Sequence, residues 1–436
     1  MKIFWKLTTI AILSGSAILS SCTGCNNRNE RINETKTDFK SNTKEQNKLN
    51  KSSDILERKI SKAVFFIENS GSIFGYVNGF TEYVDVVSGL AYKNRFSEEK
   101  TPRQFYFING GEKLEIENIG SNPSDLNDKL NLNGFDCGDP SKSNLNSMFQ
   151  LALSRAKHDT ISILISDGIY DIGKQAPMNA LSTEGNETKE KFINRLSEGD
   201  LQTIIIKLNS HFDGNYFPVT GGSVKLSQNR PFYIWIFGET KLLNEYFPED
   251  YIKSLKGYSD VARFLKLSEL QIPFQITAHE KVGDFKFDRS NKNKLTNVKT
   301  DRTGQGFQFT IATDFSTLPF SDSYLKSITN YSCSNLNYSI NNVCDIGDIN
   351  LYGLNFTPTH LITAYTNRSP FCQLDISLLN TVPNWIKNTN INNEKNIIDD
   401  TSHTFGFKFL TNAICQAYQY KNREANIVTF KFELLK

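Results

Sequence analysis

The chain has 436 residues, of which 38% are hydrophobic and 12% aromatic, so it is long enough for two domains with substantial cores. Its formal net charge is only +2, and no cluster of lysine and arginine stands out. This composition argues against both a nucleic-acid-binding protein and a polyanionic scaffold.

The amino terminus has the pattern of a processing signal. Lys2 and Lys6 precede an apolar segment, Leu7 to Leu19, that is too short to span a bilayer. The segment ends in Leu19-Ser20-Ser21-Cys22, which resembles a bacterial lipobox. The resemblance implies a signal peptide at 1–21, lipidation of Cys22 and a lipid anchor in the cell envelope, for which we expect the outer membrane. An ordinary secretory signal peptide cleaved nearby is the alternative.

Residues 22–60 follow as a predicted disordered tether. They are rich in Asn, Lys, Glu, Thr and Ser, with few and scattered apolar residues. Such a segment cannot bury enough apolar surface to offset the conformational entropy of folding.

A buried strand is predicted at Ala63–Ile67, and Glu68, Ser70 and Ser72 follow it directly. Apolar residues at helical spacing predict a helix over 79–92. Further strands are expected at 104–108, 113–119, 160–165, 201–208 and 231–237. Further helices are expected from 143, over 189–196 and over 239–247. A long loop is expected over 168–186 and a hairpin insertion over 212–230. Strands interleaved with helices predict an α/β domain at 61–247, built on a doubly wound, mostly parallel six-stranded sheet.

The sequence pattern changes after this domain. Apolar residues at helical spacing predict a helical connector at 248–267. From 268 to 436, short alternating segments, one of them at 404–409, are separated by Asn, Ser, Asp and Gly. This spacing is typical of an all-β module, most simply a sandwich, and the region contains no chemical motif.

Three polar motifs follow predicted elements of the α/β domain. They are Glu68-Asn69-Ser70-Gly71-Ser72, then Ser143 before a helix, and then Ser166-Asp167-Gly168 after the strand at 160–165. Their order and spacing resemble the metal-ion-dependent adhesion site of von Willebrand factor A domains, whose first motif is Asp-x-Ser-x-Ser. The chain departs from the family pattern at Glu68, where the family has Asp. The resemblance covers about 185 residues.

The resemblance implies a shared site for a divalent cation. Ser70, Ser72 and Ser143 would supply hydroxyl oxygens, and Glu68 and Asp167 would supply carboxylates, directly or through water. Such hard oxygen ligands suit Mg²⁺, or Mn²⁺ in its place. In the family, the carboxylate of a partner completes the coordination shell.

The sequence therefore predicts a membrane-anchored lipoprotein that binds a protein or peptide partner and is not an enzyme. A metal-independent scaffold or assembly lipoprotein of the cell envelope is the alternative. A metal-assisted hydrolase is a third class, although no general base is evident beside the motif.

Six cysteines remain if Cys22 is lipidated, and disulfides are permitted in an exported chain. Cys333 with Cys344 is one candidate pair, and Cys372 with Cys415 is another. Spacing alone proves neither pair.

Overall fold

The computed structural model describes residues 60–93, 101–111, 113–173, 176–219, 221–266, 271–304, 306–392, 394, 400–422 and 426–436. The expected signal peptide at 1–21, the expected lipidation site Cys22 and residues 22–59 of the expected tether lie outside these ranges. No helix within the described ranges is both long and apolar enough to cross a lipid bilayer.

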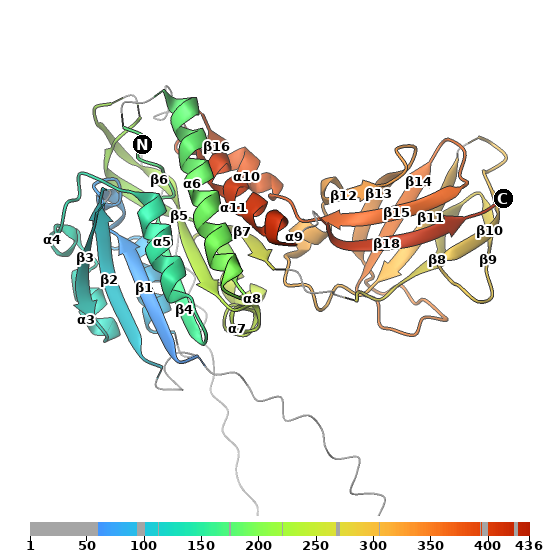
Figure 1. Cartoon of the computed structure of the whole chain (residues 1–436), viewed down its shortest axis with the longest axis horizontal. Helices are drawn as coiled ribbons and strands as arrows, with labels where there is room; N and C mark the ends of the chain where they lie inside the picture. Colours follow the sequence, from blue (N-terminus) through green and yellow to red (C-terminus); the bar gives the residue numbers. More distant parts are fainter. Residues whose placement is uncertain are drawn as a thin grey trace, which may run out of the picture. The chain divides into compact units, whose positions relative to one another are not determined.

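A seven-stranded sheet is the largest sheet of the described chain (Figure 1), and its strand order is β3-β2-β1-β4-β6-β5-β7. Among its described strands, β1 pairs in parallel with β2 and β4, whereas the other neighbours pair antiparallel. The fold is therefore mixed α/β. The strands are β1 (Lys62–Glu68), β2 (Arg103–Gly110), β3 (Leu114–Gly120), β4 (Thr160–Ser166), β5 (Gln202–Tyr216), β6 (Val224–Gly238) and β7 (Tyr258–Leu265).

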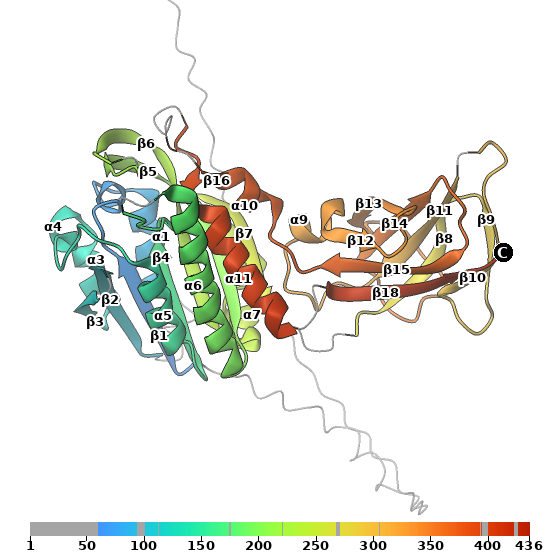
Figure 2. The ribbon, with the colours of Figure 1, turned by 45° about the horizontal axis from the view of Figure 1, so that its top comes forward.

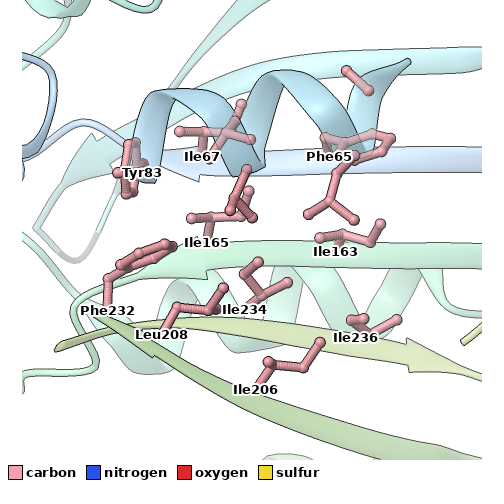
Figure 3. Close-up of a cluster of buried hydrophobic side chains, with 14 of the residues drawn as sticks. Phe65, Ile67, Tyr83, Ile163, Ile165, Ile206, Leu208, Phe232, Ile234 and Ile236 are labelled. Carbon is pink, nitrogen blue, oxygen red and sulfur yellow. The ribbon is translucent and has the colours of Figure 1, made fainter. Parts of the chain in front are cut away.

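Helices cover both faces of this sheet, because successive side chains of a strand point to opposite faces. Phe65 and Ile67 of β1 belong to one hydrophobic core and Val64 and Phe66 to the other. Figure 3 shows part of the first core, where Tyr83 lies near the strands. Helices of the first face are α1 (Glu82–Ala91), α3 (Pro123–Lys129), α4 (Leu132–Phe135), α7 (Thr240–Tyr246) and α8 (Glu249–Lys253). Helices of the second face are α5 (Leu145–Arg155), α6 (Pro177–Ser197), α10 (Asn384–Thr389) and α11 (Phe407–Asn422). Helices α5, α6 and α11 lie side by side in Figures 1 and 2.

Two parts of the sheet differ from the sequence prediction, which expected six strands. The segment 212–230 forms a hairpin as predicted, but it is not a separate insertion, because β5 and β6 pair continuously from Gln202 opposite Gly238 to Tyr216 opposite Val224. Residues 258–265 of the predicted helical connector form β7, which pairs with β5 at the edge of the sheet. A short apolar segment fits either periodicity, and here the exposed edge of β5 provides hydrogen-bond partners that select the strand.

Two further sheets enclose a third core and agree with a β-rich region after the α/β domain. Their strand orders are β12-β15-β18-β10-β9 and β13-β14-β11-β8. Phe309 of one sheet and Phe432 of the other pack with ring centroids 5.6 Å apart. The elements are β8 (Phe274–Val282), β9 (Asp284–Phe287), β10 (Lys294–Lys299), β11 (Phe307–Thr313), α9 (Asp322–Leu325), β12 (Tyr331–Cys333), β13 (Ser339–Asp345), β14 (His360–Thr366), β15 (Cys372–Leu379) and β18 (Asn426–Leu434).

One segment of the predicted β-rich region packs on the seven-stranded sheet instead. Phe407 of α11 stacks on Tyr233 of β6, with ring centroids 4.2 Å apart. The predicted strand at 404–409 is limited to β17 (Thr404–Phe405), which pairs with β16 (Asn390–Ile391). Gly406 follows with a φ of +68°, a left-handed turn that glycine adopts without steric cost, and α11 begins at the next residue.

The candidate disulfides are not formed. Cys137 and the four cysteines of the proposed pairs all carry free thiols. Cys372 packs against the core of the β-rich region, whereas Cys415 belongs to the second core of the α/β sheet. Cys333 and Cys344 lie on β12 and β13, which belong to different sheets.

Candidate functional site

The first loop of the site leaves the carboxyl end of β1 and is held by hydrogen bonds to backbone carbonyl groups of the segment 135–140. Glu68 is the last residue of β1. The Asn69 side chain donates to the carbonyl oxygens of Phe135 and Cys137, both at 3.0 Å. The Gly71 amide donates to the Pro140 carbonyl at 2.8 Å. These bonds hold the loop in place with its serine hydroxyls near Glu68.

The second loop brings Ser143 to the end of β2. The Gly110 amide donates to the Lys142 carbonyl, and the Asn144 amide donates back to the Gly110 carbonyl, both at 3.0 Å. The Asn144 side chain then caps α5 by accepting from the Ser147 amide at 2.8 Å. Ser143 is thereby fixed between a strand end and a helix start, and its hydroxyl donates to Glu68 Oε1 at 2.5 Å.

The third loop leaves β4, which lies beside β1 in parallel, so the two strands end at the same edge of the sheet. Asp167 is 3% exposed, and its Oδ1 accepts from the Ile169 amide at 3.2 Å. Gly168 has a φ of +71°, and a β carbon there would lie 2.9 Å from the Tyr233 ring. Glycine is therefore required for the chain to turn away directly after Asp167.

The five predicted site residues meet in one cavity. The Ser70 hydroxyl donates to Glu68 Oε1 at 2.7 Å and lies 3.1 Å from the Ser72 hydroxyl, which also hydrogen-bonds to Asp167. Glu68, Ser70, Ser72, Ser143 and Asp167 all line this cavity of about 970 Å³. The structure thus brings together all three polar motifs that the sequence singled out.

Both carboxyl groups of the site are buried in surroundings that oppose their ionisation. Burial and the neighbouring Asp167 raise the pKa of Glu68 to about 7, although the hydroxyls of Ser143, Ser166 and Ser70 favour its ionised form. Burial also raises the pKa of Asp167, against the Ser72 hydroxyl and the Arg230 guanidinium. Two buried carboxyl groups in such proximity do not ionise independently.

The donor set fits a hard divalent cation. Glu68 is 1% exposed, and its Oε2 has no hydrogen-bond partner in the described part of the chain. A buried carboxylate oxygen without a partner is costly, and a cation would remove that cost. Three hydroxyls and two carboxylates are the ligand types that Mg²⁺ and Mn²⁺ accept.

Several residues around the cavity were not found from the sequence. Arg230 is 2% exposed, and its guanidinium carbon lies 4.0 Å from the ring centroid of Tyr216. Glu394 is also buried, and it accepts from the Tyr216 hydroxyl and, at 2.6 Å, from the Val219 amide. Because Glu394 lies far along the chain, after most of the β-rich strands, no spacing could have placed it here.

A separate group of metal-ligand residue types lies in the β-rich region. One ligand atom from each of Asp322, Asp345 and His360 lies within 4.8 Å of the others. The Lys326 ammonium contacts the carboxylates of Asp345 and, at 3.3 Å, Asp322. The lysine therefore already neutralises charge in this cluster.

No family model, curated protein or solved structure matches the chain.

Proposed function

We propose that this chain is a lipid-anchored lipoprotein of the cell envelope that binds a protein or peptide partner through a cation site in a von Willebrand factor A-like domain. Glu68, Ser70, Ser72, Ser143 and Asp167 would hold Mg²⁺ or Mn²⁺. The observation that carries the proposal is the convergence of three loops on two buried carboxyl groups, one of which has an unpaired oxygen. When bound, the ion supplies an open coordination position for an anionic oxygen of the partner.

The sheet supports the family resemblance at one end and departs from it at the other. β3 is an antiparallel edge next to β2, as in the family. The antiparallel β5–β6 hairpin lies beside β4 and departs from a doubly wound arrangement of parallel strands. The site residues lie at and just after the end of β1, just after β4 and in the loop beside β2, in the part that resembles the family.

Thermal melting with and without the ion tests this proposal. An ion that binds only the folded state raises the melting temperature, by an amount equivalent to about 2.7 kcal/mol at a hundredfold excess over Kd. We expect such a rise with Mg²⁺ or Mn²⁺, its reversal by EDTA, and its loss in Ser143→Ala. Ser141→Ala is the matched control, because the Ser141 hydroxyl donates to Asp139 in the same loop.

Other outcomes assign the chain to the alternative classes. An unchanged melting temperature with every ion, together with a Ser143→Ala variant that behaves like the parent, would favour a metal-independent scaffold. Turnover of ester or phosphoester substrates that is lost in Asp167→Ala would favour a metal-assisted hydrolase.

A further inference from the structure

The β5–β6 hairpin extends past the edge of the sheet on which the site lies. β4 ends at Ser166, which pairs with Tyr233 of β6. Beyond this point, β6 continues away from β4 to Val224, and β5 pairs with β6 alone from Ser210 to Tyr216. The curved ends of β5 and β6 are visible beyond the body of the sheet in Figure 2. Since β4 leads directly into Asp167, this extension forms a wall beside the candidate cation site.

Contacts from two sides hold this wall in position. Glu394 accepts from the Tyr216 hydroxyl and from the Val219 amide, which fixes the strand end and the turn after it. The Arg230 guanidinium, from β6, stacks on the ring of the same Tyr216. Phe217 lies against the first loop, because a β carbon on Gly71 would be 3.3 Å from its ring. The hairpin tip therefore lies next to the serine hydroxyls of the site.

The cavity enclosed in this way has a polar end and an apolar wall. The five candidate ligands form the polar end. The rest of the lining includes apolar and aromatic side chains, namely Ile169, Tyr170, Ile172, Phe217, Val219 and Phe405, together with the charged residues Lys142, Asp171 and Glu394. Its volume of about 970 Å³ is within the range of ~300–1,000 Å³ in which proteins bind small ligands or short segments.

We propose that the partner of this site is the carboxyl-terminal end of a peptide chain. Its terminal carboxylate would face the cation site, and the apolar side chain of its last residue would pack against the wall of Phe217 and Phe405. This inference rests on the proposed function. It differs from recognition of an acidic side chain on a folded surface, because the candidate ligands share a cavity of about 970 Å³ with apolar side chains, which suits a chain end that brings its own side chain.

Fluorescence anisotropy with labelled peptides tests this inference directly. The probes are a mixed-sequence hexapeptide library ending in Leu with a free carboxylate, the same library amidated, the same library ending in Gly, and a disulfide-cyclised peptide that presents an internal Asp. In Mg²⁺, we expect the free Leu-ended library to bind at least tenfold more tightly than the amidated and Gly-ended libraries, because the carboxylate and the apolar side chain each contribute.

Variants of the wall separate this inference from the proposed function. Phe217→Ala should weaken binding of the Leu-ended library several-fold and leave the Mg²⁺-dependent melting shift intact. Phe80→Ala is the matched control, because Phe80 is 79% exposed and does not line the cavity. Glu394→Ala should act like Phe217→Ala by releasing the hairpin tip.

Each result supports or overturns a specific claim. Equal binding of the amidated library, or tighter binding of the cyclic Asp peptide, with a normal Mg²⁺ shift would overturn the chain-end inference and retain the cation site. Absence of any Mg²⁺ or Mn²⁺ shift would overturn the proposed function itself, and the inference with it.

Discussion

Glu68 is a carboxyl group in surroundings that oppose its charge. It is buried beside Asp167, and the hydroxyls of Ser70 and Ser143 both donate to its Oε1. Its pKa is therefore about 7 in the folded chain, against an ordinary value of 4.5. Between pH 4.5 and about pH 7, the folded state holds a proton on Glu68 that the unfolded state has lost. The free energy of unfolding therefore falls as pH rises through this window.

The metal-free protein should show this pH dependence. In EDTA, the free energy of unfolding in urea should fall between pH 5 and pH 8, and this fall should be smaller in Glu68→Gln, which carries no ionisable group at this position. The Gln variant should also be at least as stable as the parent at pH 8, because it removes a buried charge. Equal pH slopes for parent and variant would show that Glu68 ionises as it does in water.

The convergence of the first and third motifs was predictable from a local rule, whereas Ser143 was expected at the site only from the family resemblance. Parallel strands that lie side by side end at one edge of a sheet, so polar residues placed directly after β1 and β4 must come close together. Arg230 and Glu394 follow no such rule. Their positions depend on the twist of a long hairpin and on a segment that returns from the β-rich strands, and neither is encoded in local spacing.

The packing of helix α6 against helix α11 explains why the sequence prediction missed the first half of α6. α6 begins at Pro177, within the segment predicted as a loop, and it contains Gly185. A β carbon on Gly185 would lie 3.4 Å from the Phe409 carbonyl oxygen of α11. The glycine that weakens the helical pattern in the sequence thus permits close packing of a helix that lies far along the chain.

Docking of α11 depends in part on a buried hydroxyl pair. The Tyr418 and Thr203 hydroxyls lie 2.8 Å apart, and both residues are fully buried. Tyr418→Phe should lower the free energy of unfolding by about 1–3 kcal/mol, because the Thr203 hydroxyl loses its partner. The double variant Tyr418→Phe with Thr203→Val should recover part of this loss in urea denaturation. Full additivity of the two single variants would show that the pair does not interact.

In the whole molecule, the core of the α/β sheet is completed only by helices from the last part of the chain. The described chain forms the seven-stranded sheet by residue 266, continues through the strands at 274–379, and then returns with α10 and α11. Leu410, Ile414 and Tyr418 of α11 belong to the same core as Trp235 of β6. The predicted boundaries at 247 and 268 therefore do not separate two independent cores.

Truncation tests this dependence. A fragment of residues 60–266 should leave the α11-facing surface of the sheet uncovered and fail to melt cooperatively, whereas residues 60–436 should melt in a cooperative transition. Circular dichroism during heating, with analytical gel filtration for aggregation, distinguishes the two. A monomeric 60–266 fragment with a sharp melting transition would show that the sheet does not need α10 and α11.

The most direct test of the cation site is a titration with Mn²⁺ followed by electron paramagnetic resonance, in which the signal of the free aqueous ion disappears on binding. We expect one bound ion per chain, competition by Mg²⁺, and loss of binding in both Glu68→Gln and Asp167→Asn, with Ser141→Ala unchanged. A free-ion signal that is as strong with the parent protein as in buffer would contradict it.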